Sequence, residues 1–115
     1  MKAALPLALL SLILSGTQAN ARALSDSARR GLALGEARCA ACHGVTANAT
    51  SPEPEAPTWQ DIANRPGTTS VTLRRFLRDS HNYPAAMKFT MKPGHIRDLA
   101  NYIATLKRKG YKPEI

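Results

Sequence analysis

The chain has 115 residues and a formal net charge of +8, which limits it to one small, basic domain. Two phenylalanines, one tryptophan and three tyrosines leave little aromatic material for a core. The excess of positive charge favours an acidic partner. The basic residues do not form a recognition helix with interleaved aromatic side chains, so we expect no binding to nucleic acid.

Residues 1–23 have the order of a secretory signal peptide. A lysine in the second position precedes an apolar, leucine-rich run over residues 3–16, and small residues in A-x-A spacing follow it. The run is too short to span a membrane, and no stop-transfer pattern follows. We expect cleavage after about Ala21 or Ala23, export to the periplasm, and a mature domain over 24–115 with no membrane span. An uncleaved N-terminal anchor is the alternative.

The first helix is predicted over residues 28–38, because residues 25–27 supply good N-cap side chains. Gly31 and Gly35 interrupt this segment, and glycine in a helix interior costs stability. We therefore expect a second helix to cross close to the first one at that point. The helix leads directly into Cys39.

Cys39, Cys42 and His43 form a C-x-x-C-H sequence, the form taken by sites of c-type haem attachment. On a helical turn the two thiols are near neighbours, able to reach the two vinyl groups of one porphyrin, while His43 can bind the iron. A covalently held haem c would also supply the apolar core that the composition lacks.

Other chemistries of this cysteine pair are disfavoured rather than excluded. A thioredoxin-like C-x-x-C needs a βαβ setting, whereas the flanking segments look helical. An exported chain could close Cys39 to Cys42 as a disulfide. A zinc site needs four ligands, and no second C-x-x-C or H-x-x-x-H pair is present. The last alternative is a chance cluster of buried cysteines. It leaves unexplained why both of the chain's cysteines fall within this short motif.

Residues 44–57 are predicted to be a loop, because three prolines stand among small and polar residues. Pro57 is the expected point at which the backbone returns to His43. A carbonyl oxygen there could accept the imidazole Nδ1–H and fix the tautomer of the histidine. An ordinary turn is the alternative for Pro57.

Residues 59–63 predict a short helical turn that begins with Trp59. A buried indole N–H needs an acceptor, and a haem propionate is available as one. Plain core packing explains Trp59 equally well.

A third helix is predicted from about Val71 to Asp79, preceded by cap candidates at residues 68–70. It should present its apolar side chains to the core and its arginines to solvent. The inward set is Val71, Leu73, Phe76 and Leu77, and the outward set is Arg74, Arg75 and Arg78.

The last helix has the clearest periodicity. Pro93 is tolerated at its start, and Gly110 can end it after the cationic residues 107–109. Apolar residues recur at helical spacing at Ile96, Leu99, Ala100, Ile103 and Leu106.

Four side chains could bind the iron opposite His43: His81, Met87, Met91 and His95. Met91 and His95 would require the haem to lie against the start of the last helix. Met87 is predicted to lie on a less constrained segment, which can lie over the ring. Either methionine could instead fill a gap in the core.

The mature chain resembles the bacterial monohaem class I cytochromes c. Gly31 lies eight residues before Cys39, as the family's N-terminal helix glycine does, and residues 98–106 resemble its C-terminal helix signature D-L-x-x-Y-I-x-x-L. Residues 56–59 resemble the loop whose proline carbonyl supports the ligand histidine. The resemblance implies an all-α fold of three to four short helices around one covalent haem, with Gly31 packed against Tyr102.

The family places its axial methionine in a Met-Pro pair about a dozen residues before the position of Leu99. Met87 fits this distance, but Lys88 stands where the proline is expected, and Pro84 lies upstream. We therefore expect Met87 to be the sixth ligand, with Met91 as the alternative.

The resemblance implies a single-electron carrier rather than an enzyme. A haem-based peroxidase or gas sensor with an open distal site is the alternative, as is a haem subunit of a larger oxidoreductase. We expect a monomer that docks an acidic redox partner through Lys88, Lys92 and residues 107–109, in an encounter that salt weakens.

Overall fold

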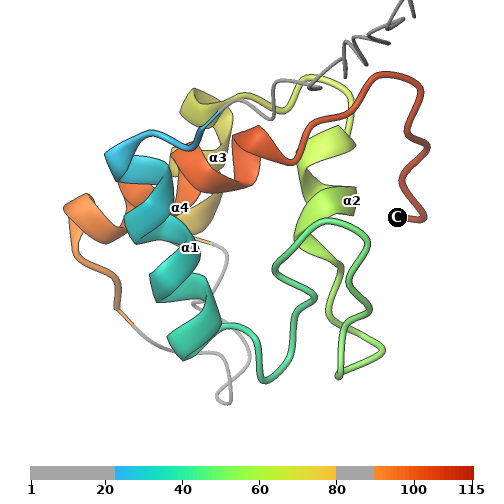
Figure 1. Cartoon of the computed structure of the whole chain (residues 1–115), viewed down its shortest axis with the longest axis horizontal. Coiled ribbons are helices and arrows are strands. Elements are labelled where there is room, and N and C mark those ends of the chain that lie inside the picture. Colours follow the sequence, from blue (N-terminus) through green and yellow to red (C-terminus); the bar gives the residue numbers. More distant parts are fainter. Residues whose placement is uncertain (1–22, 80–89) are drawn as a thin grey trace, which may run out of the picture.

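The computed structural model describes residues 23–79 and 90–115, and these residues form helices and no strand (Figure 1). The predicted all-α fold is confirmed. The predicted signal peptide before residue 23, and the candidates His81, Met87 and Lys88, lie outside the described residues. The helices are α1 (Asp26–Arg38), α2 (Trp59–Asn64), α3 (Ser70–Asp79) and α4 (Pro93–Thr105).

Helix α1 begins at Asp26, before the predicted start at residue 28, because Ser25 is its cap, and it crosses α4 at Gly31. The Ser25 hydroxyl accepts the Ala28 N–H at 3.2 Å, which satisfies a donor of the first turn. A Cβ at position 31 would collide with the Asp98 carbonyl oxygen and lie 2.8 Å from the Tyr102 Cβ. The expected contact between Gly31 and Tyr102 is therefore present, and only glycine allows the helices to approach this closely.

Gly35 has a different neighbour from the one expected. A Cβ there would collide with the six-membered ring of Trp59, so this glycine makes room for an indole and not for a crossing helix. The two glycines therefore fix two contacts of α1, one with α4 and one with the first residue of α2.

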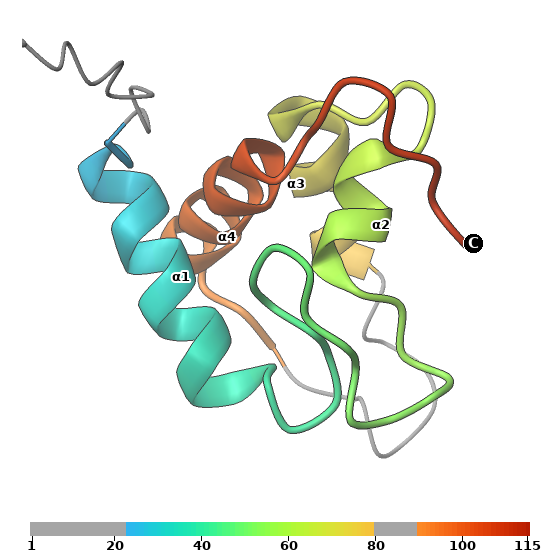
Figure 2. The ribbon, with the colours of Figure 1, turned by 45° about the vertical axis from the view of Figure 1, so that its right-hand side comes forward.

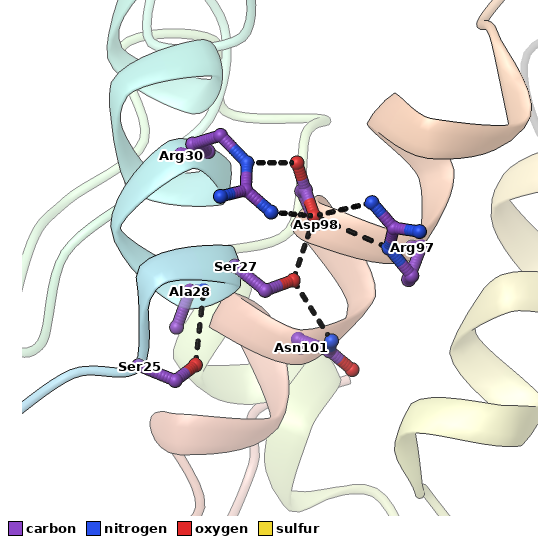
Figure 3. Close-up of polar contacts among 7 residues, drawn as sticks. All are labelled: Ser25, Ser27, Ala28, Arg30, Arg97, Asp98 and Asn101. Carbon is purple, nitrogen blue, oxygen red and sulfur yellow. Dashed lines mark hydrogen bonds and ion pairs between the residues drawn. The ribbon is translucent and has the colours of Figure 1, made fainter.

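A buried carboxylate joins α1 to α4 beside this crossing (Figure 3). Asp98 accepts from Arg30 Nε at 2.8 Å and from the Ser27 hydroxyl at 2.6 Å. Asn101 in turn donates to Ser27 at 2.9 Å. The hydrogen bonds from Arg30 and Ser27 hold the pKa of Asp98 well below its ordinary value, so the carboxylate stays charged and keeps these donors.

Helix α3 buries a narrower stripe than its sequence predicts. Leu73 and Leu77, one turn apart, face the core, whereas Val71 is 55% exposed and Phe76 is 47% exposed. The predicted inward positions of Val71 and Phe76 are wrong because α3 packs against α4 along a single row of side chains.

The sequence predicts that helix α4 ends near Gly110, but the helix ends at Thr105. The chain turns away because Asn64 of α2 donates to the Leu106 carbonyl at 3.2 Å and accepts the Arg108 N–H at 2.8 Å. The C-terminal segment then runs beside α2 (Figures 1 and 2). No helix among the residues described is both long and apolar enough to cross a membrane.

Candidate functional site

The C-x-x-C-H sequence lies on a turn that continues α1. Cys39 is the residue that caps the helix, and its N–H donates to the Gly35 carbonyl at 2.8 Å. The N–H groups of Cys42 and His43 both donate to the Cys39 carbonyl, at 3.1 and 2.9 Å. One helical turn thus carries both thiols and the imidazole, the arrangement that the spacing predicts.

The ring of His43 is anchored by the loop that returns to it. Its Nδ1 lies 2.7 Å from the Pro57 carbonyl oxygen, and because a carbonyl can only accept, Nδ1 carries the proton. Nε2 is then the basic nitrogen of the ring, which is the form that binds a metal. The contact expected between Pro57 and His43 is present.

Backbone contacts hold this loop in place between the end of α1 and α2 (Figure 2). The Trp59 N–H donates to the Gly44 carbonyl at 2.9 Å, next to the Pro57 acceptor. The Gly44 N–H donates to the Ser51 hydroxyl at 3.0 Å. The bond between Trp59 and Gly44 therefore ties the chain just after Pro57 to the residue that follows His43.

Two further side chains support the loop, and the sequence does not predict either role. The buried Tyr102 hydroxyl donates to the Val45 carbonyl at 2.8 Å, which joins α4 to the residues just after His43. The buried Gln60 side chain accepts the Asn48 N–H at 2.8 Å. The helix signature of α4 identifies Tyr102 as a core residue, but no local pattern identifies Gln60.

Trp59 packs behind the histidine. It is 4% exposed, and its ring centroid lies 6.5 Å from that of His43 and 5.9 Å from that of Tyr102. Its six-membered ring lies against Gly35. Core packing of Trp59 is present, and its contact with a haem propionate stays a prediction.

The two cysteines differ in environment. Cys39 is half-buried, Cys42 is exposed, and neither forms a disulfide. Burial raises the pKa of the Cys39 thiol, an effect that the neighbouring Arg38 partly offsets. Two cysteines outside any disulfide, on one turn with an oriented imidazole, fit a haem held by two thioethers and one nitrogen ligand.

The alternative chemistries find no support in the fold. Within residues 23–79 and 90–115, no group of three or more His, Cys, Asp and Glu side chains could hold a metal ion. The same residues contain no strand from which a thioredoxin-like unit could be built.

Of the four candidates for the sixth ligand, Met91 and His95 are among the described residues. Met91 is half-buried and packs against the core, where it lines a small cavity together with Cys39 and Leu99. His95 lies in the first turn of α4 and lines the same cavity. The thioether of Met91 is thus part of the packing at the start of α4.

Comparison with known proteins gives a family match over most of the chain. Residues 28–107 match the family described as Cytochrome c. Cytochrome c-552 of Bradyrhizobium diazoefficiens is 30% identical over 96 residues, which cover 84% of this chain and 90% of that protein. No solved structure gives a significant match.

Proposed function

Because the chain belongs to the cytochrome c family, we propose that it is a periplasmic carrier of single electrons whose haem c is attached through Cys39 and Cys42, with His43 and Met87 as axial ligands. Membership of the family implies covalent haem c and haem-based electron transfer. The observation that carries the residue assignment is the hydrogen bond between His43 Nδ1 and Pro57 at the end of the C-x-x-C-H turn.

Each of these residues has a separate task. The haem supplies the one-electron chemistry when it is bound. Cys39 and Cys42 hold it on the packed end of α1, so its position relative to the protein is fixed. His43 would present Nε2 to the iron, and the Pro57 carbonyl holds the imidazole in the tautomer that leaves this nitrogen available. Trp59 excludes water behind the imidazole.

The packing of Met91 supports Met87 as the sixth ligand. Met91 is packed against the core beside Cys39 and Leu99, so moving its thioether to an iron away from these residues would give up those contacts. That movement would leave a void at the start of α4, which costs stability. Met87 lies outside the described residues, and its spacing before Leu99 suits the ligand.

Replacing Met87 by alanine should remove the weak long-wavelength absorption band of the oxidised protein and lower its midpoint potential, because methionine ligation favours reduced iron. The matched variant Met91→Ala should keep the band and instead destabilise the fold by about 2 kcal/mol. Optical spectra and redox titration of both holoproteins make the test. Loss of the band in Met91→Ala alone would assign the ligand to Met91.

High-spin iron in the unaltered protein, with ready binding of carbon monoxide, would favour the peroxidase or gas-sensor function.

Of the cations assigned to partner docking, those among the described residues lie at the two ends of α4. Lys92 is the N-cap residue of α4 and follows Met91, which lines a cavity with Cys39, while Lys107 donates to the Thr68 carbonyl at 2.8 Å beyond the C-terminal end of the helix. A helix of 13 residues separates them by about 20 Å. We therefore assign docking of an acidic redox partner to the Lys92 end, nearer the proposed haem attachment.

Raising the ionic strength should slow electron exchange with such a partner, because screening weakens the attraction that brings the two proteins together. Lys92→Glu should slow the exchange further at low salt, whereas the exposed Lys109→Glu should have a smaller effect. Stopped-flow rates at several salt concentrations measure both effects. A rate that does not depend on salt, or equal effects of the two variants, would contradict the docking assignment.

A further inference from the structure

The chain beyond α4 forms a strap over α2. This C-terminal strap, residues 107–115, makes its contacts mainly with one side of that short helix (Figure 2). The Arg108 N–H donates to the Asn64 side chain at 2.8 Å, and Lys107 donates to the Thr68 carbonyl at 2.8 Å. Two further hydrogen bonds, from Tyr111 and Glu114, go to Asp61.

Asp61 is a buried carboxylate, 6% exposed, whose donors come from two directions. From the strap, the Tyr111 hydroxyl and the Glu114 N–H both donate to Oδ1, at 2.9 and 3.1 Å. From the N-cap position just before α2, the Thr58 hydroxyl donates to Oδ2 at 2.8 Å. Burial alone would raise the pKa of Asp61, but these hydrogen bonds outweigh it and lower the pKa.

Thr58 connects this carboxylate to the histidine. Its hydroxyl caps α2 by accepting the Asp61 N–H at 3.1 Å, so the residues before it are fixed relative to Asp61. The preceding residue is Pro57, whose carbonyl oxygen accepts the proton of His43 Nδ1. The bonds therefore form a continuous series from Tyr111 through Asp61, Thr58 and Pro57 to His43.

We propose that Asp61 and Tyr111 are positioning residues for the axial histidine: the C-terminal strap, through Asp61 and Thr58, holds the Pro57 carbonyl where it accepts the His43 proton. The proposal rests on His43 being an iron ligand, as proposed above. A strong hydrogen bond at Nδ1 makes the imidazole a better donor and favours oxidised iron. Loosening the strap should weaken that bond and raise the midpoint potential.

The holoprotein variant Tyr111→Phe tests the proposal, because it removes one donor to Asp61 and keeps the aromatic ring. We expect a higher midpoint potential and faster solvent exchange of the His43 Nδ1 proton, measured by NMR on the reduced protein. A chain that ends at Gly110 loses both strap donors and should shift further in the same direction. The matched control Lys107→Met breaks a strap contact that does not reach Asp61, so it should leave both readouts unchanged.

An unchanged potential and exchange rate in Tyr111→Phe and in the shortened chain would overturn the proposal. Equal shifts in Tyr111→Phe and Lys107→Met would also overturn it, because they would reflect general loosening of the strap. The failure of the proposed function looks different: the unaltered protein would then lack histidine-ligated haem in its spectrum. Histidine-ligated haem with a potential that does not respond to the strap variants refutes the positioning role alone.

Discussion

Trp59→Ala should destabilise the holoprotein by about 3–5 kcal/mol, the range typical of removing a buried aromatic side chain. The indole is 4% exposed and fills the space between Gly35, Tyr102 and His43. Glycine at position 35 has no side chain of its own that could fill the space left by the indole. Denaturant unfolding, followed by far-ultraviolet circular dichroism, measures the loss.

Trp59→Phe is the control that separates packing from hydrogen bonding. Phenylalanine keeps most of the apolar contact and removes the indole N–H. If Trp59 only packs, this variant should lose much less stability than Trp59→Ala and leave the midpoint potential unchanged. If the indole also donates to a haem propionate, the potential should shift. Near-native stability of Trp59→Ala would show that the indole does not support the fold.

Gly31→Ala should destabilise the protein by about 1–3 kcal/mol, because the new methyl group would meet backbone atoms that cannot rotate away. The Asp98 carbonyl lies against the glycine, and the Tyr102 Cβ is close behind it. Helices α1 and α4 would have to separate, and the bonds from Arg30 and Ser27 to Asp98 would lengthen with them. Urea unfolding of the two holoproteins compares their stabilities.

Gly94→Ala is the matched control for that substitution. Gly94 lies in the first turn of α4, and a Cβ built there would meet no described atom within 4 Å apart from its chain neighbours and the backbone of its own helix. Alanine should therefore stabilise the protein slightly, by up to about 1 kcal/mol, through its higher helix propensity. Changes of the same sign and size at the two positions would contradict the close crossing at Gly31.

The helices could be predicted because their signals are local. A Ser25 cap, an apolar row in α4 and a proline-rich loop each act within a few residues of where they stand. The end of α4 could not be predicted in this way, because Asn64, more than forty residues earlier, decides it. The exposure of Val71 and Phe76 likewise depends on how widely α3 and α4 touch, which periodicity does not reveal.

The same distinction between local and distant signals applies to the candidate site. The C-x-x-C-H turn and the return of Pro57 to His43 follow from spacing and from the family resemblance, and the hydrogen bond between them is present. Gln60, Asp61 and the Tyr102 hydroxyl act through partners that are distant in sequence or are backbone groups. Such partners leave no pattern in the sequence, so these roles emerge only from the fold.

The central claim is that Cys39 and Cys42 hold one haem covalently, and the mass of the intact protein after export tests it most directly. Denatured and freed of loosely bound groups, the protein should have the mass of its polypeptide plus one haem. The variant with Cys39→Ala and Cys42→Ala together should have the mass of the polypeptide alone. A haem that separates from the unaltered chain on denaturation, leaving the bare polypeptide, would contradict the claim.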